Sequence, residues 1–335
     1  MAVDWSSLRV GDIMYMNMPS IVGHSTVSYF TLKNSTITTE YTMWNKPYGC
    51  SMVWMMVGGG GAGGGGGCGS TAGSARGGGG SGGGSGVTKA LIAACMIPDI
   101  LIIRVGRGGA GGAGSTGGGT GTSGSSGIKS YVMDGSISTT AGELNLILSS
   151  SSSSPTGGGG GSTASGGSAG AGGTASGSTS QRRHLGVHEN IIGNAGVVGG
   201  AQTGENGTSK SYPTSGIFCF GGCGGAGAQS ADFAGGSITP IADSIISECL
   251  PAAGAAGSVN GDIGNALRLA PFSFGSKYPF FNHCGYGGGS SNSTVGGNGG
   301  DGGGYGCGGS GGGAGVTTGG RGGDGASGIV VLIAW

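Results

Sequence analysis

The chain has 335 residues, 91 of them glycine, and its 14 basic and 14 acidic side chains leave no net charge. Charged residues make up 8 % of the sequence, against about 25 % in ordinary globular domains. This balance argues against a nucleic-acid partner, and glycine at about four times its usual frequency argues against a conventional core of packed side chains.

Residues 1–41 predict a small N-terminal β module. The segment VGDIMYMNM within residues 1–20 suits a strand, and residues 25–41 are rich in threonine, isoleucine and aromatic residues with a turn at 33–35. The first residues carry Asp4 and lack an apolar h-region, so they do not predict a secretory signal.

An apolar strand that turns abruptly into glycine begins the remainder of the chain. Residues 44–57 read WNKPYGCSMVWMMV and are followed directly by GGGGAGGGGG. We expect a strand over residues 42–57, with a bend at 47–49. Residues 329–335 form a second apolar segment that follows directly from glycine, and we expect the two strands to pair and close a glycine-rich domain over residues 42–335.

The most apolar window, residues 87–105, has about the length of a membrane span. It contains Lys89, Pro98, Asp99 and Arg104, so we do not expect membrane insertion. Pro98 and Asp99 are typical turn residues. The window therefore predicts two short strands, 89–97 and 100–105, in a hairpin or a strand–turn–strand cap.

Glycine-dense stretches then alternate with ordinary sequence. The glycine-dense stretches are 58–86, 106–127, 157–180, 221–227, 285–289 and 296–328. Polyglycine II geometry has three residues per turn and a rise of about 3.1 Å, and it leaves every N–H and C=O free to bond a neighbouring helix. A collagen triple helix is excluded because the runs lack a strict Gly-X-Y period and the chain has only 9 prolines. The predicted fold is mostly irregular and β: the N-terminal module plus packed polyglycine II helices closed by the strand pair.

Motifs for nucleotides and catalysis are missing. No lysine follows a glycine as a phosphate-binding loop requires, and G-x-G-x-x-G matches carry no information in a chain with this much glycine. The sequence offers neither a paired-carboxylate segment nor a Ser-His-Asp set. We therefore expect no enzymatic activity and no cofactor.

Metal sites are also not predicted. His184 and His188 have a spacing that suits a helix, but Gly186 between them favours a loop. Cys219 and Cys223 lack a second cysteine pair, and the eight cysteines follow no disulfide framework, so we expect reduced thiols. The segments NGGDGGGYG and RGGDG lack the large apolar residue that calcium-binding glycine repeats carry after the aspartate.

Three segments together resemble a known family. The first is W-x-K-P-x-G-C, followed by an apolar strand and GGGGxGGGGG; the second is VGRGGAGGAG at 105–114; the third is GGDGASGIVVLIAW at the end. Together they resemble the glycine-rich domain of bacteriophage tail-fibre and receptor-binding proteins. The nearest case is the polyglycine II sandwich of tail-fibre adhesins from T4-like phages. The resemblance covers residues 42–335 and implies a virion protein, present in several copies on the particle surface, whose loops bind a host surface protein or glycan.

Residues 1–41 match no attachment domain of that family, and we expect them to dock on other virion proteins. The alternative within the resemblance is a capsid decoration or head-fibre protein with the same rigid body. A glycine-rich antifreeze protein would fit the lattice but would not explain the N-terminal module or the apolar strand pair.

Two segments are candidates for receptor contact. The densest aromatic cluster is APFSFGSKYPFFNHCGY, and clustered aromatic side chains are favourable anchors at a binding surface. The alternative is that these side chains plug the end of the lattice as a hydrophobic cap. The second segment, QRRHLGVHEN, gathers charge in an otherwise uncharged region. The candidate residues are Phe272, Phe274, Lys277, Tyr278, Phe280, Phe281, Arg182, Arg183, His184 and His188.

Overall fold

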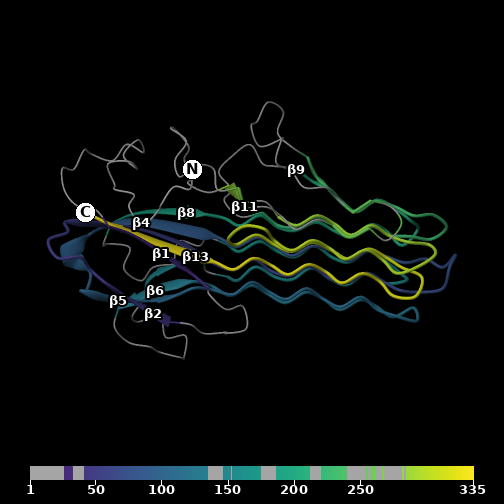
Figure 1. The fold of residues 1–335 in the computed structure, drawn as a ribbon, viewed down its shortest axis with the longest axis horizontal. Coiled ribbons are helices and arrows are strands. Elements are labelled where there is room, and N and C mark those ends of the chain that lie inside the picture. The colour runs from purple at the N-terminus through teal and green to yellow at the C-terminus, as the bar shows by residue number, and fades with distance from the viewer. Residues whose placement is uncertain are drawn as a thin grey trace, which may run out of the picture.

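The computed structural model describes residues 26–32, 41–134, 146–151, 153–174, 186–211, 220–239, 254–255, 257, 259–261, 266–267, 281–282 and 284–335. Within these ranges the chain is strand or irregular, and the only helical element is a 3₁₀ turn, Ala94–Met96. The prediction of a mostly β and irregular fold is confirmed. The strands gather at one end of an elongated molecule, and the glycine runs extend side by side from them to the other end (Figure 1).

Two antiparallel sheets make up the strand end, and neither closes into a barrel. The five-stranded sheet has the order β1 (Thr26–Thr31), β13 (Ile329–Ala334), β3 (Met52–Gly58), β4 (Val87–Ala93) and β8 (Gly186–Ile191). The four-stranded sheet has the order β2 (Tyr41–Asn45), β5 (Ile100–Arg104), β6 (Tyr131–Asp134) and β7 (Leu146–Ser149). Two short pairs complete the described strands: β9 (Lys210–Ser211) with β10 (Ile238–Thr239), and β11 (Ala266–Leu267) with β12 (Phe281–Asn282).

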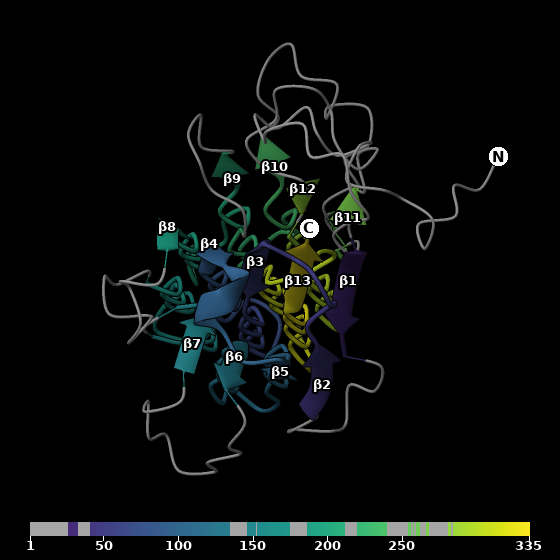
Figure 2. The same cartoon turned by 90° about the vertical axis from the view of Figure 1, so that its left-hand side faces the viewer.

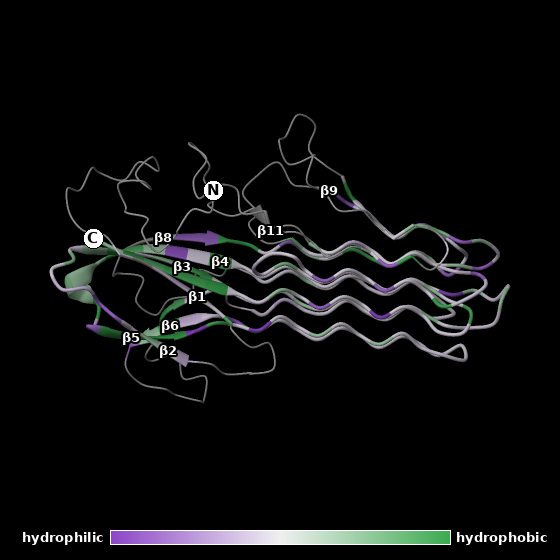
Figure 3. Ribbon diagram, viewed as in Figure 1, coloured by the Kyte–Doolittle hydropathy of each residue, from purple (hydrophilic) through white to green (hydrophobic). Residues whose placement is uncertain are grey.

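Both larger sheets contribute to one hydrophobic core, which appears as the apolar region at the strand end (Figure 3). Because side chains alternate along a strand, Val53, Met55 and Val57 of β3 face this core together. Trp44 of β2 joins the core with its ring, while its Nε1 donates a hydrogen bond of 3.2 Å to Ser28 Oγ. The core is therefore a conventional side-chain core, confined to the strand end.

The predicted strand over residues 42–57 is wrong in extent. It is two strands in different sheets, since β2 pairs with β5 while β3 pairs with β13 and β4. The chain turns between them at Gly49, whose φ of 78° lies in the left-handed region that side chains disfavour. The turn residues Pro47 and Gly49 thus move the chain from one sheet to the other.

The hairpin predicted around Pro98 is also wrong, and the strand–turn–strand alternative is correct. β4 and β5 belong to different sheets, joined by the 3₁₀ turn and Pro98. Lys46 fixes this corner because its Nζ donates to the carbonyls of Ala94 and Ile97 at 2.9 Å and pairs with Asp99 at 2.9 Å.

β13 is an inner strand of the five-stranded sheet, between the edge strand β1 and the central strand β3. Ile329 is opposite Gly58 and Ala334 is opposite Val53, while the other side of β13 pairs with β1. All six residues of β13 are buried. β1 comes from the predicted N-terminal module, and the strands predicted within residues 1–25 and 33–40 lie outside the described residues.

The glycine runs continue directly from the strands (Figures 1 and 2). Their hydrogen bonds repeat every three residues. In the run 58–68, the N–H groups of Gly60, Gly63 and Gly66 donate to carbonyls of the run 122–128. The N–H groups one position later, at Gly61, Gly64 and Gly67, donate to the run 320–326. Those two positions later, at Ala62, Gly65 and Cys68, donate to the run 77–83. Its carbonyls accept from three further runs, 106–115, 157–161 and 307–315, so six runs surround it.

Position in the body explains which runs are almost pure glycine. The runs 58–68, 77–86 and 307–315 have neighbours on all sides, and a Cβ added at Gly63 would overlap the backbone carbonyl of Ala110. Runs at the edge have one open side, where every third residue carries a side chain. Ala110 and Ala113 show this spacing in one edge run, and Arg321 and Asp324 show it in the next.

Candidate functional site

The structure places few of the sequence-predicted receptor residues. Phe281 lies in β12 opposite Leu267, and His188 lies in β8 opposite Ala90. The other candidates lie outside the described residues: Phe272, Phe274, Lys277, Tyr278, Phe280, Arg182, Arg183 and His184. Their grouping into a receptor surface or a hydrophobic cap therefore stays a prediction.

The described residues that flank the segment 181–184 lie at the strand end. On one side, the N–H of Gly173 donates to the carbonyl of Gly84, three residues before β4 begins. On the other side, Gly186 begins β8 in the five-stranded sheet. The described residues on both sides of this candidate segment thus lie at the strand end.

A second exposed surface lies at the opposite end, which we call the distal tip. It consists of the short turns where outward runs reverse: residues 69–76, 116–119, 162–165, 201–204, 229–232, 291–294 and 316–318. Glycines enable the tight reversals, and Gly117 and Gly118 have φ of 62° and 84°. The exposed side chains include Thr71, Thr116, Thr163, Thr203, Ser230, Ser293 and Thr317. The distal tip therefore presents small side chains rich in hydroxyl groups.

Arg76 holds several of these turns together from inside. Its side chain is fully buried, and its guanidinium donates to the carbonyls of Ser74, Ser70 and Gln229 at 3.1, 3.3 and 3.1 Å. It also donates to Asn292 Oδ1, so one side chain links three separate turns of the tip. Burial lowers the pKa of Arg76, and a buried cation is retained in proteins only where hydrogen bonds compensate it, as these do.

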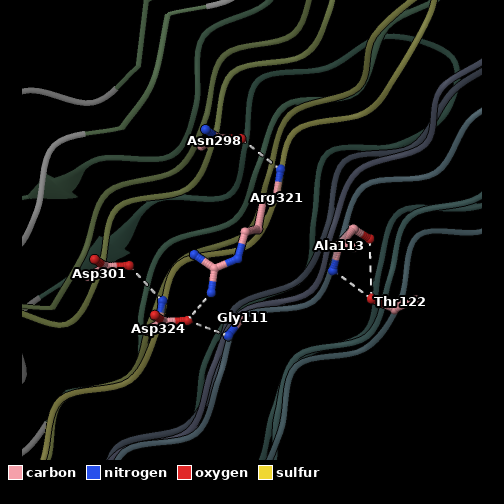
Figure 4. A network of polar contacts seen from close by, with 7 residues as sticks. All are labelled: Gly111, Ala113, Thr122, Asn298, Asp301, Arg321 and Asp324. Carbon is pink, nitrogen blue, oxygen red and sulfur yellow. Dashed lines mark hydrogen bonds and ion pairs between the residues drawn. The ribbon is translucent and has the colours of Figure 1, made fainter. Parts of the chain in front are cut away.

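Polar side chains cap the outermost backbone groups on a lateral face of the body (Figure 4). Asp324 Oδ1 accepts from the N–H of Gly111 at 2.7 Å and pairs with the guanidinium of Arg321. The N–H groups of Asp324 and Arg321 in turn donate to Asp301 Oδ1 at 2.7 Å and Asn298 Oδ1 at 2.8 Å. An edge run has N–H groups that face no other run, and these side chains satisfy them.

Thr122 repeats the arrangement on the neighbouring edge. Its Oγ1 accepts from the N–H of Ala113 at 2.6 Å, and it also donates to the Ala113 carbonyl at 3.2 Å. Sequence reasoning missed these capping residues. The available signal was the spacing of three residues between Asn298 and Asp301 and between Arg321 and Asp324.

Buried thiols form a small apolar cluster beside the runs. Cys223, Cys284 and Cys307 pack with Phe220, Ile238 and Tyr286. A hydrogen bond with Cys223 and then burial raise the pKa of Cys284, and burial also raises the pKa of Cys307. All six described cysteines are free, while Cys219 and Cys249 lie outside the described ranges. The described part of the chain contains no group of three or more His, Cys, Asp or Glu side chains that could hold a metal ion.

Comparisons with known proteins add no relative: neither the family models nor the curated proteins give a match to this chain. In the part of the chain that the structure describes, no helix has the length and apolar character to cross a membrane.

Proposed function

We propose that the glycine runs are polyglycine II helices and that the pairing of β3 with β13 closes their lattice. The three-residue repeat of hydrogen bonds supports this, because polyglycine II has three residues per turn and no hydrogen bonds within a helix. Each run is bonded only to other runs and not to itself. The β3–β13 pair leads directly into the runs 58–68 and 319–328, so it holds two neighbouring helices at their base.

We further propose that the chain is a non-enzymatic structural protein of a bacteriophage virion, acting as a tail-fibre or tail-tip adhesin. The observation that carries the proposal is a body in which a central run is bonded to six others and which separates two exposed ends. Such a body is stiff, because each run is fixed along its length by backbone hydrogen bonds. A stiff spacer between a docking end and a contact end is what an adhesin needs.

The position of β1 indicates which end docks. Thr26 is opposite Ala334, at the end of the sheet that faces away from the runs, so residues before β1 reach the body there. Docking of residues 1–41 on other virion proteins would then turn the strand end toward the particle and the distal tip toward the host. The hydroxyl-rich tip, held by Arg76, is accordingly a receptor surface to set beside the predicted segments 181–190 and 272–286.

Adsorption of phage carrying altered copies of this chain tests the two surfaces separately. One variant replaces residues 277–281, and a matched variant replaces Thr163 and Ala164 at the exposed tip turn with lysines. We expect one of the two to reduce adsorption at least tenfold (about 1.4 kcal/mol) while the body stays folded. Normal adsorption by both variants would contradict the adhesin proposal.

Antibody labelling of virions distinguishes the remaining alternative. Label confined to the tail supports the adhesin, whereas label spread over the head would indicate a capsid decoration or head-fibre protein. Whole virions are used, so the result does not depend on which surface contacts the receptor.

A further inference from the structure

An open pocket of about 320 Å³ lies where the lateral face of the body meets the strand end. The described residues that line it are Leu32, Arg107, Gly108, Gly109, Ala110, Asp324, Gly325 and Ser327. It lies between two edge runs, 106–115 and 319–328, which are bonded to each other through Gly325 N–H and the Gly109 carbonyl at 2.8 Å.

One wall of the pocket repeats the backbone geometry found at Gly111, whose N–H is bonded by the carboxylate of Asp324. The two edge runs are antiparallel, and in their register Asp324 lies opposite Gly111 while Ser327 lies opposite Gly108. Cβ atoms added at Gly111 and Gly108 would overlap the carbonyls of Gly322 and Gly325, which are also three residues apart. The N–H groups of Gly111 and Gly108 therefore point in the same direction, one turn apart.

Gly111 and Gly108 differ in the acceptor that is available for the hydrogen bond of their N–H group. At Gly111 the acceptor is the carboxylate of Asp324, which also pairs with the guanidinium of Arg321 (Figure 4). At Gly108 the opposite residue is Ser327, and no described residue accepts a hydrogen bond from this N–H.

Arg107 supplies a cation beside this N–H, from the run 106–115 rather than from the run that carries Arg321. It lines the pocket beside Gly108, its Nε is buried without a hydrogen-bond partner, and no described acidic residue forms an ion pair with it. A buried unsatisfied donor of a charged group costs free energy until it is paired. Asp324 also lines the pocket, and its Oδ1 bonds Gly111 and Arg321.

We propose that Arg107 and the N–H of Gly108 bind a carboxylate carried by a ligand, in the manner in which Arg321 and Gly111 bind Asp324. A guanidinium with an adjacent backbone N–H matches the two oxygens of a carboxylate, and charge-assisted hydrogen bonds are about twice as strong as neutral ones. The open pocket of about 320 Å³ has room for a ring, and Ser327 and the glycine backbone offer groups that can bond hydroxyls, so a carboxylate on a sugar ring, such as a uronic acid, is the ligand class. The inference stands independently of the proposed phage function.

Titration of the whole ¹⁵N-labelled chain with glucuronate tests the site, with acetate as a minimal carboxylate, glucose as a neutral sugar and inorganic phosphate as a different anion. We expect saturable shifts of the Arg107 Nε–H and Gly108 N–H signals with glucuronate and acetate. Equal shifts with glucose, or no saturable shift with either carboxylate, would overturn the proposal. Phosphate that binds tenfold more tightly than glucuronate would overturn the assignment to carboxylates.

Ser327→Asp provides the sharpest variant, because it places a carboxylate opposite Gly108 within the chain itself. We expect it to shift the Gly108 signal without ligand and to weaken glucuronate binding at least about tenfold, while the control Ser327→Ala binds within about twofold of the wild type. Arg107→Gln should weaken binding similarly, and Lys210→Gln, which removes a remote cation, should not. Wild-type affinity in both Ser327→Asp and Arg107→Gln would contradict the site.

Discussion

A glycine inside the body is required because of what surrounds it. A Cβ at Gly63 would overlap the carbonyl oxygen and carbon of Ala110, which belong to a backbone that cannot rotate away. Gly58, five residues earlier, is different, since its added Cβ would lie 3.4 Å from Val87 Cγ2 in ordinary contact. The same residue type thus has a packing role at position 63 and little such role at position 58.

Replacing Gly63 by alanine is expected to lower the free energy of unfolding by roughly 3 kcal/mol, and valine by more, because the runs must separate and lose hydrogen bonds. The matched variant Gly58→Ala should change stability by less than about 1 kcal/mol, since alanine also restricts the unfolded chain. Urea unfolding followed by tryptophan fluorescence measures both. Equal stability of the two variants would indicate that the run is a loose linker.

Single elements differ in how far the sequence predicts them. The apolar segments before and after glycine predict β3 and β13 because a short continuous apolar run bounded by glycine is typical of a buried strand. The division of residues 42–57 between two sheets is not predictable, because it depends on which strand each half meets. The sequence also does not predict which runs lie next to each other, since glycine carries no side chain that selects a partner. The capping residues Asn298 and Asp301 were predictable from their spacing.

The run 307–315 begins with a thiol that couples stability to pH. Burial raises the pKa of Cys307 above its ordinary value of 9.0, so the folded state keeps a proton that the unfolded state loses in alkaline solution. This contribution to stability is complete below the unfolded pKa and is lost as the pH rises above it. The free energy of unfolding should fall by about 1.4 kcal/mol per pH unit for this thiol.

Urea titrations at pH values below and above the ordinary thiol pKa of 9.0 measure this slope. Cys307→Ala should make the slope shallower, whereas Cys95→Ala, at an exposed thiol, should leave it as in the wild type. An unchanged slope in Cys307→Ala would contradict the assignment to this cysteine.

At the scale of the whole molecule, a small side-chain core supports a much larger body without one. The strand end has the hydrophobic cluster, and most strands of the two larger sheets lead into a run or receive one. β13 is an inner strand of its sheet, because it pairs with β1 on one side and β3 on the other. We therefore expect the fold of the body to depend on this strand.

Removal of residues 329–335 is therefore expected to prevent folding of the entire chain, although terminal residues are often dispensable. The loss removes the strand that pairs with β1, leaves β3 paired with β4 alone, and removes buried apolar residues from the core. Hydrogen exchange of the amides in the run 58–68 measures the result, and Trp335→Ala serves as a milder control. Full amide protection in the truncated chain would show that the glycine lattice holds by itself.

The three-residue repeat also means that the body has no register of its own. A run displaced by three residues along its neighbour would find equivalent N–H and C=O groups, so the strand pairs, the tip turns and the capping side chains fix the alignment. Insertion of three glycines into every run at the same level would keep all of these contacts in place. With the rise of the proposed polyglycine II helices, the body would lengthen in steps of about 9 Å while its two ends keep their structure.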